Sequence, residues 1–251
     1  REPIWNGSAG WKEILRAYGL KFQKTNFWLD RQIIKSSLIA LTYGDYQSTS
    51  RLDNDDIINR KRLNLFFERT HRYPLWKSNL GNNFIDNSYF YSPSVISPGI
   101  DLLAQASVDL YRYDDNNYQN LFILRIGPEF VLGEYKKRFL DYTKLRIIAK
   151  TTISDGNSPF GFDQSLDNHA IEIDLTQQLF GPLTIRYSGE YSLDINSNKY
   201  HQFFNEAIEV GINRRAYDIS LFYDFGTQSG GLNFTIHSFS FDGMGNKFID
   251  Q

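Results

Sequence analysis

Residues 183–195 alternate strictly between two classes of side chain, and this alternation limits the possible folds more than any other feature. The odd positions are apolar, aromatic or small: Leu183, Ile185, Tyr187, Gly189, Tyr191, Leu193 and Ile195. The even positions are polar or charged: Thr184, Arg186, Ser188, Glu190, Ser192 and Asp194. Successive side chains of a β-strand point to opposite faces, so this period of two predicts a strand with one apolar and one polar face. At about 3.3 Å per residue it would span roughly 40 Å, which is long for a strand.

The same alternation recurs along the chain. The clearest further segments are 144–153, 171–176, 208–213, 217–225 and 232–236, and weaker ones are 33–43, 62–70, 101–113 and 120–132. A short helix is expected only at 11–20. We therefore predict one all-β domain over residues 1–251 with ten to twelve antiparallel strands, in which residues 1–30 form an N-terminal extension or a partial strand segment.

The lengths of the connections indicate a topology. Tight connections are expected at 179–182 and 214–215, and long ones at 154–168 and 194–204. If the strands run consecutively up and down, both tight turns lie on one rim of the sheet and both long loops on the other. Outer-membrane barrels have short periplasmic turns and longer external loops. The pattern therefore favours an up-and-down transmembrane β-barrel whose C-terminus is on the periplasmic side.

The two faces of the strands suit a bilayer and a wet lumen. A face with Arg186, Glu190 and Asp194 cannot lie in hydrocarbon, where one Arg or Lys near the midplane would cost about 2–4 kcal/mol. The opposite face could meet lipid. The alternative is a soluble antiparallel sheet with one solvated face. Strand length and an aromatic content of 16% favour the membrane, and the mean hydropathy of −0.44 averages two opposed faces.

Composition excludes several classes of function. The chain has no cysteine, which excludes disulfides, zinc–thiolate sites and a cysteine nucleophile. With 27 Lys+Arg against 29 Asp+Glu, it has no overall basic footprint for nucleic acid. The four histidines lack metal-ligand spacing, and His237 and Ser238, adjacent on a predicted strand, would point to opposite faces. We predict no enzymatic activity, cofactor or metal. The start at Arg1, without a signal peptide, suggests a mature or truncated product.

Several stretches of the sequence resemble one protein family. They lie at 70–76, 124–128, 133–143, 158–163, 177–183 and 231–241. Together they resemble the C-terminal β domain of cyanobacterial outer-membrane proteins described as LptD-like, the lipopolysaccharide-assembly proteins. The resemblance covers about 63–241, and its most specific part is Lys136-Lys137-Arg138-Phe139-Leu140-Asp141-Tyr142.

The resemblance implies an outer-membrane β-barrel that receives lipopolysaccharide from a periplasmic lipid-bridge protein. Such a barrel passes the lipid to the outer leaflet through a lateral opening between strands, and the barrel-assembly machinery inserts it. Better-studied relatives have a larger barrel and an N-terminal periplasmic domain. The chain is therefore expected to be either a small barrel or part of a large one.

Two groups of residues are candidates for a lipid path. Lys136, Lys137 and Arg138 lie on a turn expected at the periplasmic rim, and Lys144, Arg146 and Lys150 on the inward face of the next strand. Such a basic series suits an anionic glycolipid, but it also suits a solvated turn and an anion-selective pore. Gly127, Pro128 and Gly133 would weaken strand pairing and so mark a seam, although a simple bulge is the more ordinary interpretation of Pro128.

The sequence thus favours a barrel in the bacterial outer membrane that delivers lipopolysaccharide or a related glycolipid. Its expected partners are that lipid, the periplasmic bridge protein, the outer membrane and the barrel-assembly machinery. The alternatives are a porin-like passive channel without a seam, and a soluble β-sandwich binding module. Poorly paired first and last strands would favour lipid delivery over a sealed pore.

Overall fold

The computed structural model describes residues 2–5, 11–30, 33–49, 56–78, 96–133, 139–163, 167–214, 216–226 and 228–236. Across these ranges the protein is all-β, apart from one 3₁₀ turn, η2 (Gly161–Asp163). Eleven strands form a single antiparallel sheet, in which each strand pairs with its neighbours in the sequence. The strands are β3 (Arg16–Asp30), β4 (Ile33–Thr49), β5 (Ile57–Lys77), β6 (Gly99–Tyr113), β7 (Tyr118–Leu132), β8 (Thr143–Gly156), β9 (His169–Phe180), β10 (Leu183–Ser192), β11 (Phe203–Asn213), β12 (Tyr217–Asp224) and β13 (Ser229–Ile236). The all-β class and the consecutive antiparallel order are confirmed.

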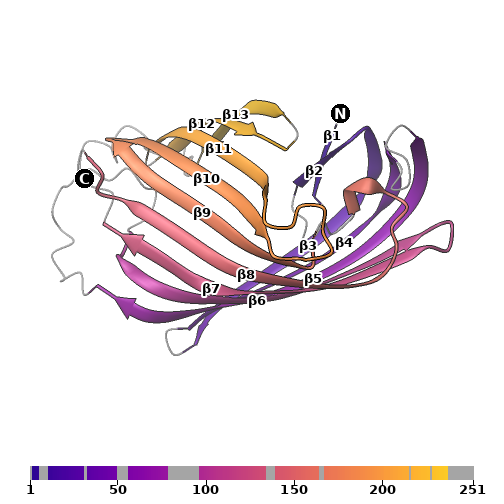
Figure 1. Ribbon diagram of the computed structural model, residues 1–251, viewed down its shortest axis with the longest axis horizontal. Coiled ribbons are helices and arrows are strands. Elements are labelled where there is room, and N and C mark those ends of the chain that lie inside the picture. Colours follow the sequence, from indigo (N-terminus) through magenta and orange to yellow (C-terminus); the bar gives the residue numbers. More distant parts are fainter. Residues whose placement is uncertain are drawn as a thin grey trace, which may run out of the picture.

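The sheet is strongly curved but open. Figure 1 shows it curling from β3 and β4 through β7 and β8 to β12 and β13, so that one face is concave. β3 and β13 are its two edges, and each has a neighbour on one side only. The closed barrel expected from the sequence is therefore not seen within the described residues.

The N-terminal residues form strands and not a helix. β1 (Glu2–Trp5) and β2 (Trp11–Ile14) pair as a separate hairpin that packs against β3, β4 and η2. The expected helix at 11–20 is wrong, because these residues belong to β2 and to the first part of β3. β3 pairs with β4 along its whole length. Fifteen residues of the supposed extension thus belong to the main sheet.

The concave face is polar and the convex face is apolar. On β5 the inward side chains Arg62 and Asn64 are each 1% exposed, whereas the outward side chains Leu65 and Phe67 are 43% and 42% exposed. The inward Asp101, Asp109 and Glu129 of β6 and β7 are also buried. Further outward apolar side chains are exposed on both halves of the sheet: Leu20, Phe22, Ile39, Leu41, Phe122, Leu124, Ile126, Leu221, Leu232 and Phe234. The concave face also buries apolar side chains such as Phe66, Leu103 and Leu121, so it is the convex face that departs from the usual burial of apolar residues in water.

The two rims of the sheet carry different connections. The β4–β5, β6–β7, β8–β9, β10–β11 and β12–β13 connections lie on one rim, here named the η2 rim, and the others on the opposite rim, named the Pro182 rim. As expected, the tight turns after β9 and β11 share the Pro182 rim, and the long connections 157–168 and 193–202 share the η2 rim. The sorting is partial, because the short 114–117 turn is on the η2 rim and the long 78–98 connection is on the Pro182 rim.

Pro128 lies in the interior strand β7 and not in an edge strand. The pairing of β7 with β6 is continuous through Pro128, but its pairing with β8 passes from Ile126–Ala149 directly to Glu129–Arg146. The register is the same on both sides, so this is a local break and not a bulge. A Cβ atom at Gly127 would lie 2.0 Å from the Ile147 carbonyl oxygen, so the strands approach closely at the break.

None of the helical turns in the described ranges is long and apolar enough to cross a membrane.

Candidate functional site

At the Pro182 rim, charged side chains of β5 to β8 form a compact group on the concave face. Lys77 Nζ lies 2.8 Å from Asp101 Oδ2, and Lys144 Nζ lies 3.1 Å from Glu129 Oε2. Arg72 bridges the two carboxylates, with Nη1 3.5 Å from Asp101 Oδ2 and a hydrogen bond to Glu129. Both carboxylates are almost fully buried, which is tolerable because each meets two cations. The three cations are partly exposed, so they form the accessible part of the group.

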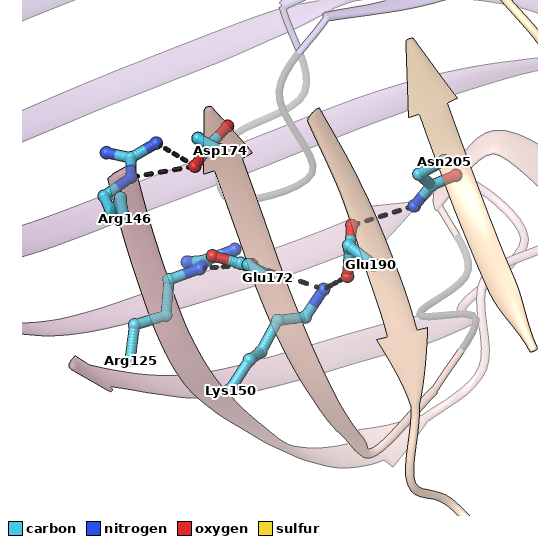
Figure 2. A network of polar contacts seen from close by, with 7 residues as sticks. All are labelled: Arg125, Arg146, Lys150, Glu172, Asp174, Glu190 and Asn205. Carbon is cyan, nitrogen blue, oxygen red and sulfur yellow. Dashed lines mark hydrogen bonds and ion pairs between the residues drawn. The ribbon is translucent and has the colours of Figure 1, made fainter. Parts of the chain in front are cut away.

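A second network crosses the middle of the concave face (Figure 2). Arg125 on β7 donates from Nε to Glu172 Oε1 on β9 over 2.9 Å. Lys150 on β8 lies 3.7 Å from the same oxygen and donates to Glu190 on β10. Asn205 on β11 donates from Nδ2 to Glu190 Oε1 over 2.9 Å. Arg125, Lys150, Glu172 and Glu190 point inward in the antiparallel register, and Asn205 reaches Glu190 from the irregularity in the pairing of β10 with β11, so the network links five neighbouring strands.

Two further ion pairs lie between these groups and the C-terminal strands. Arg146 on β8 donates from Nε and Nη2 to Asp174 Oδ2 on β9, over 2.8 and 2.6 Å (Figure 2). Arg186 on β10 donates from Nη1 to Glu209 Oε1 on β11 over 3.3 Å. The lining is therefore a mixed set of cations and carboxylates and not a purely basic one.

The predicted basic residues fall into two sets. Lys144, Arg146 and Lys150 lie on the concave face of β8, and each pairs with a carboxylate from a neighbouring strand, while Lys150 also reaches Glu190 two strands away. Lys136, Lys137 and Arg138 lie outside the described residues. The acidic partners on β9, Glu172 and Asp174, occupy even positions of an alternating segment. They could have been found from the sequence, because consecutive strands are neighbours in the sheet.

The predicted seam residues lie on β7 and just beyond it. Gly127 and Pro128 occupy the break in pairing with β8, and Gly133 follows β7 with a φ of 76°. A Cβ atom at Gly133 would lie 1.5 Å from the Asp141 carbonyl oxygen, which explains the glycine there. The free edges of the sheet are at β3 and β13, far from β7 in strand order. A seam at Gly127, Pro128 and Gly133 stays a prediction.

At the η2 rim, the β8–β9 connection inserts a buried acid into the concave face. Asp163 accepts two hydrogen bonds from Arg62 of β5, from Nε to Oδ2 over 3.0 Å and from Nη2 to Oδ1 over 2.8 Å. The Tyr113 hydroxyl also donates to Asp163 Oδ2 over 2.7 Å. Both charged side chains are 0% exposed. A bidentate pair of this kind is strong and fixes the connection in place.

Aromatic rings enclose this ion pair. The Arg62 guanidinium lies 4.7 Å from the Tyr111 ring centroid and 5.1 Å from that of Tyr46. Phe160, which is fully buried, packs its edge against Tyr113, and Ile14 at the end of β2 belongs to the same cluster. The β8–β9 connection and the N-terminal hairpin therefore fill the concave face at the η2 rim. This cluster could not be predicted from the sequence, because Arg62 and Asp163 are 101 positions apart.

A second acid ties two connections of the η2 rim together. Asp194, in the β10–β11 connection, accepts from the backbone N–H of Asn168 through Oδ2 over 2.9 Å and from that of Asn196 through Oδ1 over 3.0 Å. These backbone N–H groups hold the pKa of the Asp194 carboxyl below its ordinary value. The β8–β9 and β10–β11 connections are thus joined at this point.

The described part of the chain contains no group of three His, Asp or Glu side chains that could hold a metal ion. Its charged side chains are engaged mainly with one another, in the arrangement of a polar lining.

A family described as "Protein of unknown function (DUF3769)" matches residues 1–240 of the chain. No curated protein and no solved structure matches the chain.

The buried pair predicts a large effect of removing one charge. Asp163→Asn leaves the Arg62 guanidinium buried without a countercharge, which should cost about 3–5 kcal/mol in the free energy of unfolding. Urea unfolding of the detergent-solubilised protein would measure this. Asp115→Asn is the control, because Asp115 pairs with the part-exposed Arg60 at 3.4 Å and should cost less than about 1 kcal/mol. Equal, small effects of the two substitutions would contradict a buried ion pair.

Asp194 predicts a pH dependence of stability. Its pKa is lower in the folded than in the unfolded protein, so it stabilises the fold above the unfolded pKa, and that contribution is lost as the pH falls through the folded pKa. The urea concentration at the unfolding midpoint should therefore be higher for the wild type than for Asp194→Ala at neutral pH. The difference between the two midpoints should shrink on acidification. A difference that stays constant from neutral to acidic pH would contradict the charged role of Asp194.

Proposed function

The chain belongs to the DUF3769 family, and on that premise we propose that it is a barrel-forming protein of the bacterial outer membrane that delivers lipopolysaccharide, or a related glycolipid, to the outer leaflet. The observation that carries the proposal is the reversed polarity of the sheet. Its convex face exposes apolar side chains and its concave face holds charged ones.

The convex face suits a bilayer better than water. Soluble monomers rarely expose contiguous apolar patches larger than a few hundred Å². Here outward Leu, Ile and Phe side chains are exposed from β3 to β13, across the whole width of the sheet. A bilayer would cover this face at no cost, because lipid tails are as apolar as the side chains that meet them.

The sheet edges support a barrel within the membrane. Backbone N–H and C=O groups at a free edge have no water to bond with in hydrocarbon, so only closed barrels cross membranes as sheets. β3 and β13 each have one unpaired side in the described sheet. In a bilayer these edges would pair with each other or with further strands, and that junction would be the natural place for a lateral opening.

The contents of the concave face favour glycolipid delivery over a passive channel. Partly exposed cations at the Pro182 rim, and the partly exposed Arg146–Asp174 pair beside them, suit an anionic, sugar-rich head group. At the η2 rim, the aromatic cluster around Arg62 and Asp163 covers the ends of β4 to β7 on the concave face. A porin needs an open path through both rims, whereas a carrier that releases its lipid sideways does not.

The Pro182 rim is the side of the sheet that would meet the bridge protein. The Pro182 rim, with its tight turns after β9 and β11, would face the periplasm and receive lipid from the bridge protein. The ends of β7 and β8 that flank Lys136, Lys137 and Arg138 lie at this rim. Those cations are therefore suited to meeting a lipid phosphate or an acidic surface of the bridge protein. The barrel-assembly machinery would insert the protein into the outer membrane.

The membrane-facing role of the convex face predicts a depth-dependent cost of charge. Leu65→Arg, near the middle of β5, should destabilise the protein in lipid by about 2–4 kcal/mol, whereas Ile57→Arg at the strand end should cost at most about 1 kcal/mol. Unfolding in lipid vesicles or bilayer discs measures both. If both substitutions cost less than about 0.5 kcal/mol, as on an ordinary wet surface, the membrane assignment fails.

Depletion of the protein in its host tests the delivery of glycolipid. We expect surface lipopolysaccharide, detected on intact cells, to fall as the protein is depleted, and a plasmid copy to restore it. Uptake of small hydrophilic solutes serves as the second readout. Unchanged surface lipopolysaccharide together with reduced solute uptake would overturn the proposal in favour of a porin.

A further inference from the structure

The C-terminal half of the concave face contains an open cavity of about 390 Å³. It is lined by strands β9 to β13 and is separate from the cluster at the η2 rim. The side chains that matter for its chemistry are Asp174, Arg186, Ser188, Glu209, Phe222 and Asn233. Its volume is within the range of about 300–1,000 Å³ that small-ligand sites occupy.

The register of the sheet explains why the cavity lies here. Arg186, Glu209, Phe222 and Gly231 are aligned across β10 to β13 and form one wall. In the adjacent row, Ser188 of β10 pairs with Ala207 of β11, and these short side chains leave the space open.

The Phe222 ring lies against Gly231, a glycine on the edge strand β13. A Cβ atom at Gly231 would lie 2.8 Å from Cε1 and 2.9 Å from Cζ of Phe222, so the ring lies directly over Gly231. A larger residue at 231 would push against the ring. Phe222 therefore places an aromatic ring beside the polar groups of the cavity.

The charges around the cavity are balanced and oriented. Arg186 pairs with Glu209, and Arg146 holds Asp174 through two hydrogen bonds. Two cations thus meet two carboxylates, and all four side chains stay between 25% and 41% exposed. A balanced set gives little net attraction for a free anion such as phosphate.

The donors and acceptors match a ligand rich in hydroxyl groups. Carboxylates accept hydrogen bonds, guanidinium groups donate them, and the Ser188 hydroxyl and the Asn233 amide do both. A sugar ring presents adjacent hydroxyls to such groups and an apolar C–H face to an aromatic ring. A purely apolar ligand would leave the charged groups unsatisfied.

We propose that this cavity is a saccharide-binding site that holds a neutral sugar unit, with Phe222 against the ring face and Glu209, Arg186 and Asp174 bonded to its hydroxyls. The site deepens the proposed function and rests on it for the source of the sugar, which is the head group of the delivered glycolipid. The binding chemistry itself depends only on the cavity.

The test uses the full chain in detergent and a panel of neutral trisaccharides of glucose, galactose, mannose and N-acetylglucosamine, with inorganic phosphate as the competing probe. Calorimetric titration should show binding of at least one trisaccharide. Phe222→Leu and Glu209→Gln should each weaken that binding about tenfold, by removing the stacking surface or a charged acceptor. Asp115→Asn is the matched control, because it removes an ion-paired carboxylate on the 114–117 turn, away from the cavity, and should change binding less than about twofold.

Three results would overturn the saccharide site: no trisaccharide binds, phosphate binds in preference, or the cavity variants and Asp115→Asn behave alike. These results are independent of the depletion experiment. If depletion lowers surface lipopolysaccharide but no trisaccharide binds, only the assignment of the cavity is contradicted. If trisaccharide binding depends on Phe222 and Glu209 but depletion leaves surface lipopolysaccharide unchanged, only the delivery role is contradicted.

Discussion

The pairing of charges across neighbouring strands on the concave face is the interaction on which the rest of the structure depends. Arg146 and Lys150 are acceptable there because β9 and β10 present Asp174, Glu172 and Glu190 opposite them. Breaking such a set would leave uncompensated charge. The same pairs fix the register, because a slip of one residue would turn every charged side chain to the apolar face. A sheet with this inner face must therefore keep its apolar side chains outside.

That constraint leaves the fold incomplete in water in two separate ways. The convex face exposes apolar side chains, and the edges β3 and β13 expose backbone hydrogen-bonding groups. Lipid covers the first but cannot satisfy the second, since hydrocarbon offers no hydrogen bonds. Strand-to-strand contact satisfies the second but leaves the face exposed. Under the proposed function, both needs are met when the sheet closes, alone or with further strands, inside a bilayer.

The sequence predicted what depends on local periodicity and missed what depends on distant contacts. The segments from 33 to 236 that alternate with a period of two are strands, and their consecutive order brings Lys150 beside Glu172 and Glu190. At 11–20 the expected helix was wrong, because residues 11–14 pair with β1 and residues 16–20 with β4, and this pairing outweighs a weak local preference. The Arg62–Asp163 pair could not be foreseen, because it depends on how a connection folds back over a strand 101 residues away. Pro128 broke the pairing without a bulge, since its missing N–H affects one neighbour only.

The two ends of the concave face differ in a way that gives the proposed path a direction. At the Pro182 rim, partly exposed cations lie over the buried Asp101 and Glu129, so an arriving anionic head group meets positive charge first. Between the rims, the balanced cavity beside Phe222 suits the neutral sugars that follow. At the η2 rim, the described residues around Arg62 and Asp163 are packed as a protein core, which a head group could pass only by breaking a buried ion pair. Within the proposed function, the barrier to release of the lipid is therefore lower sideways than through the η2 rim. The sideways path is the junction at β3 and β13, where the acyl chains would already be in contact with the bilayer.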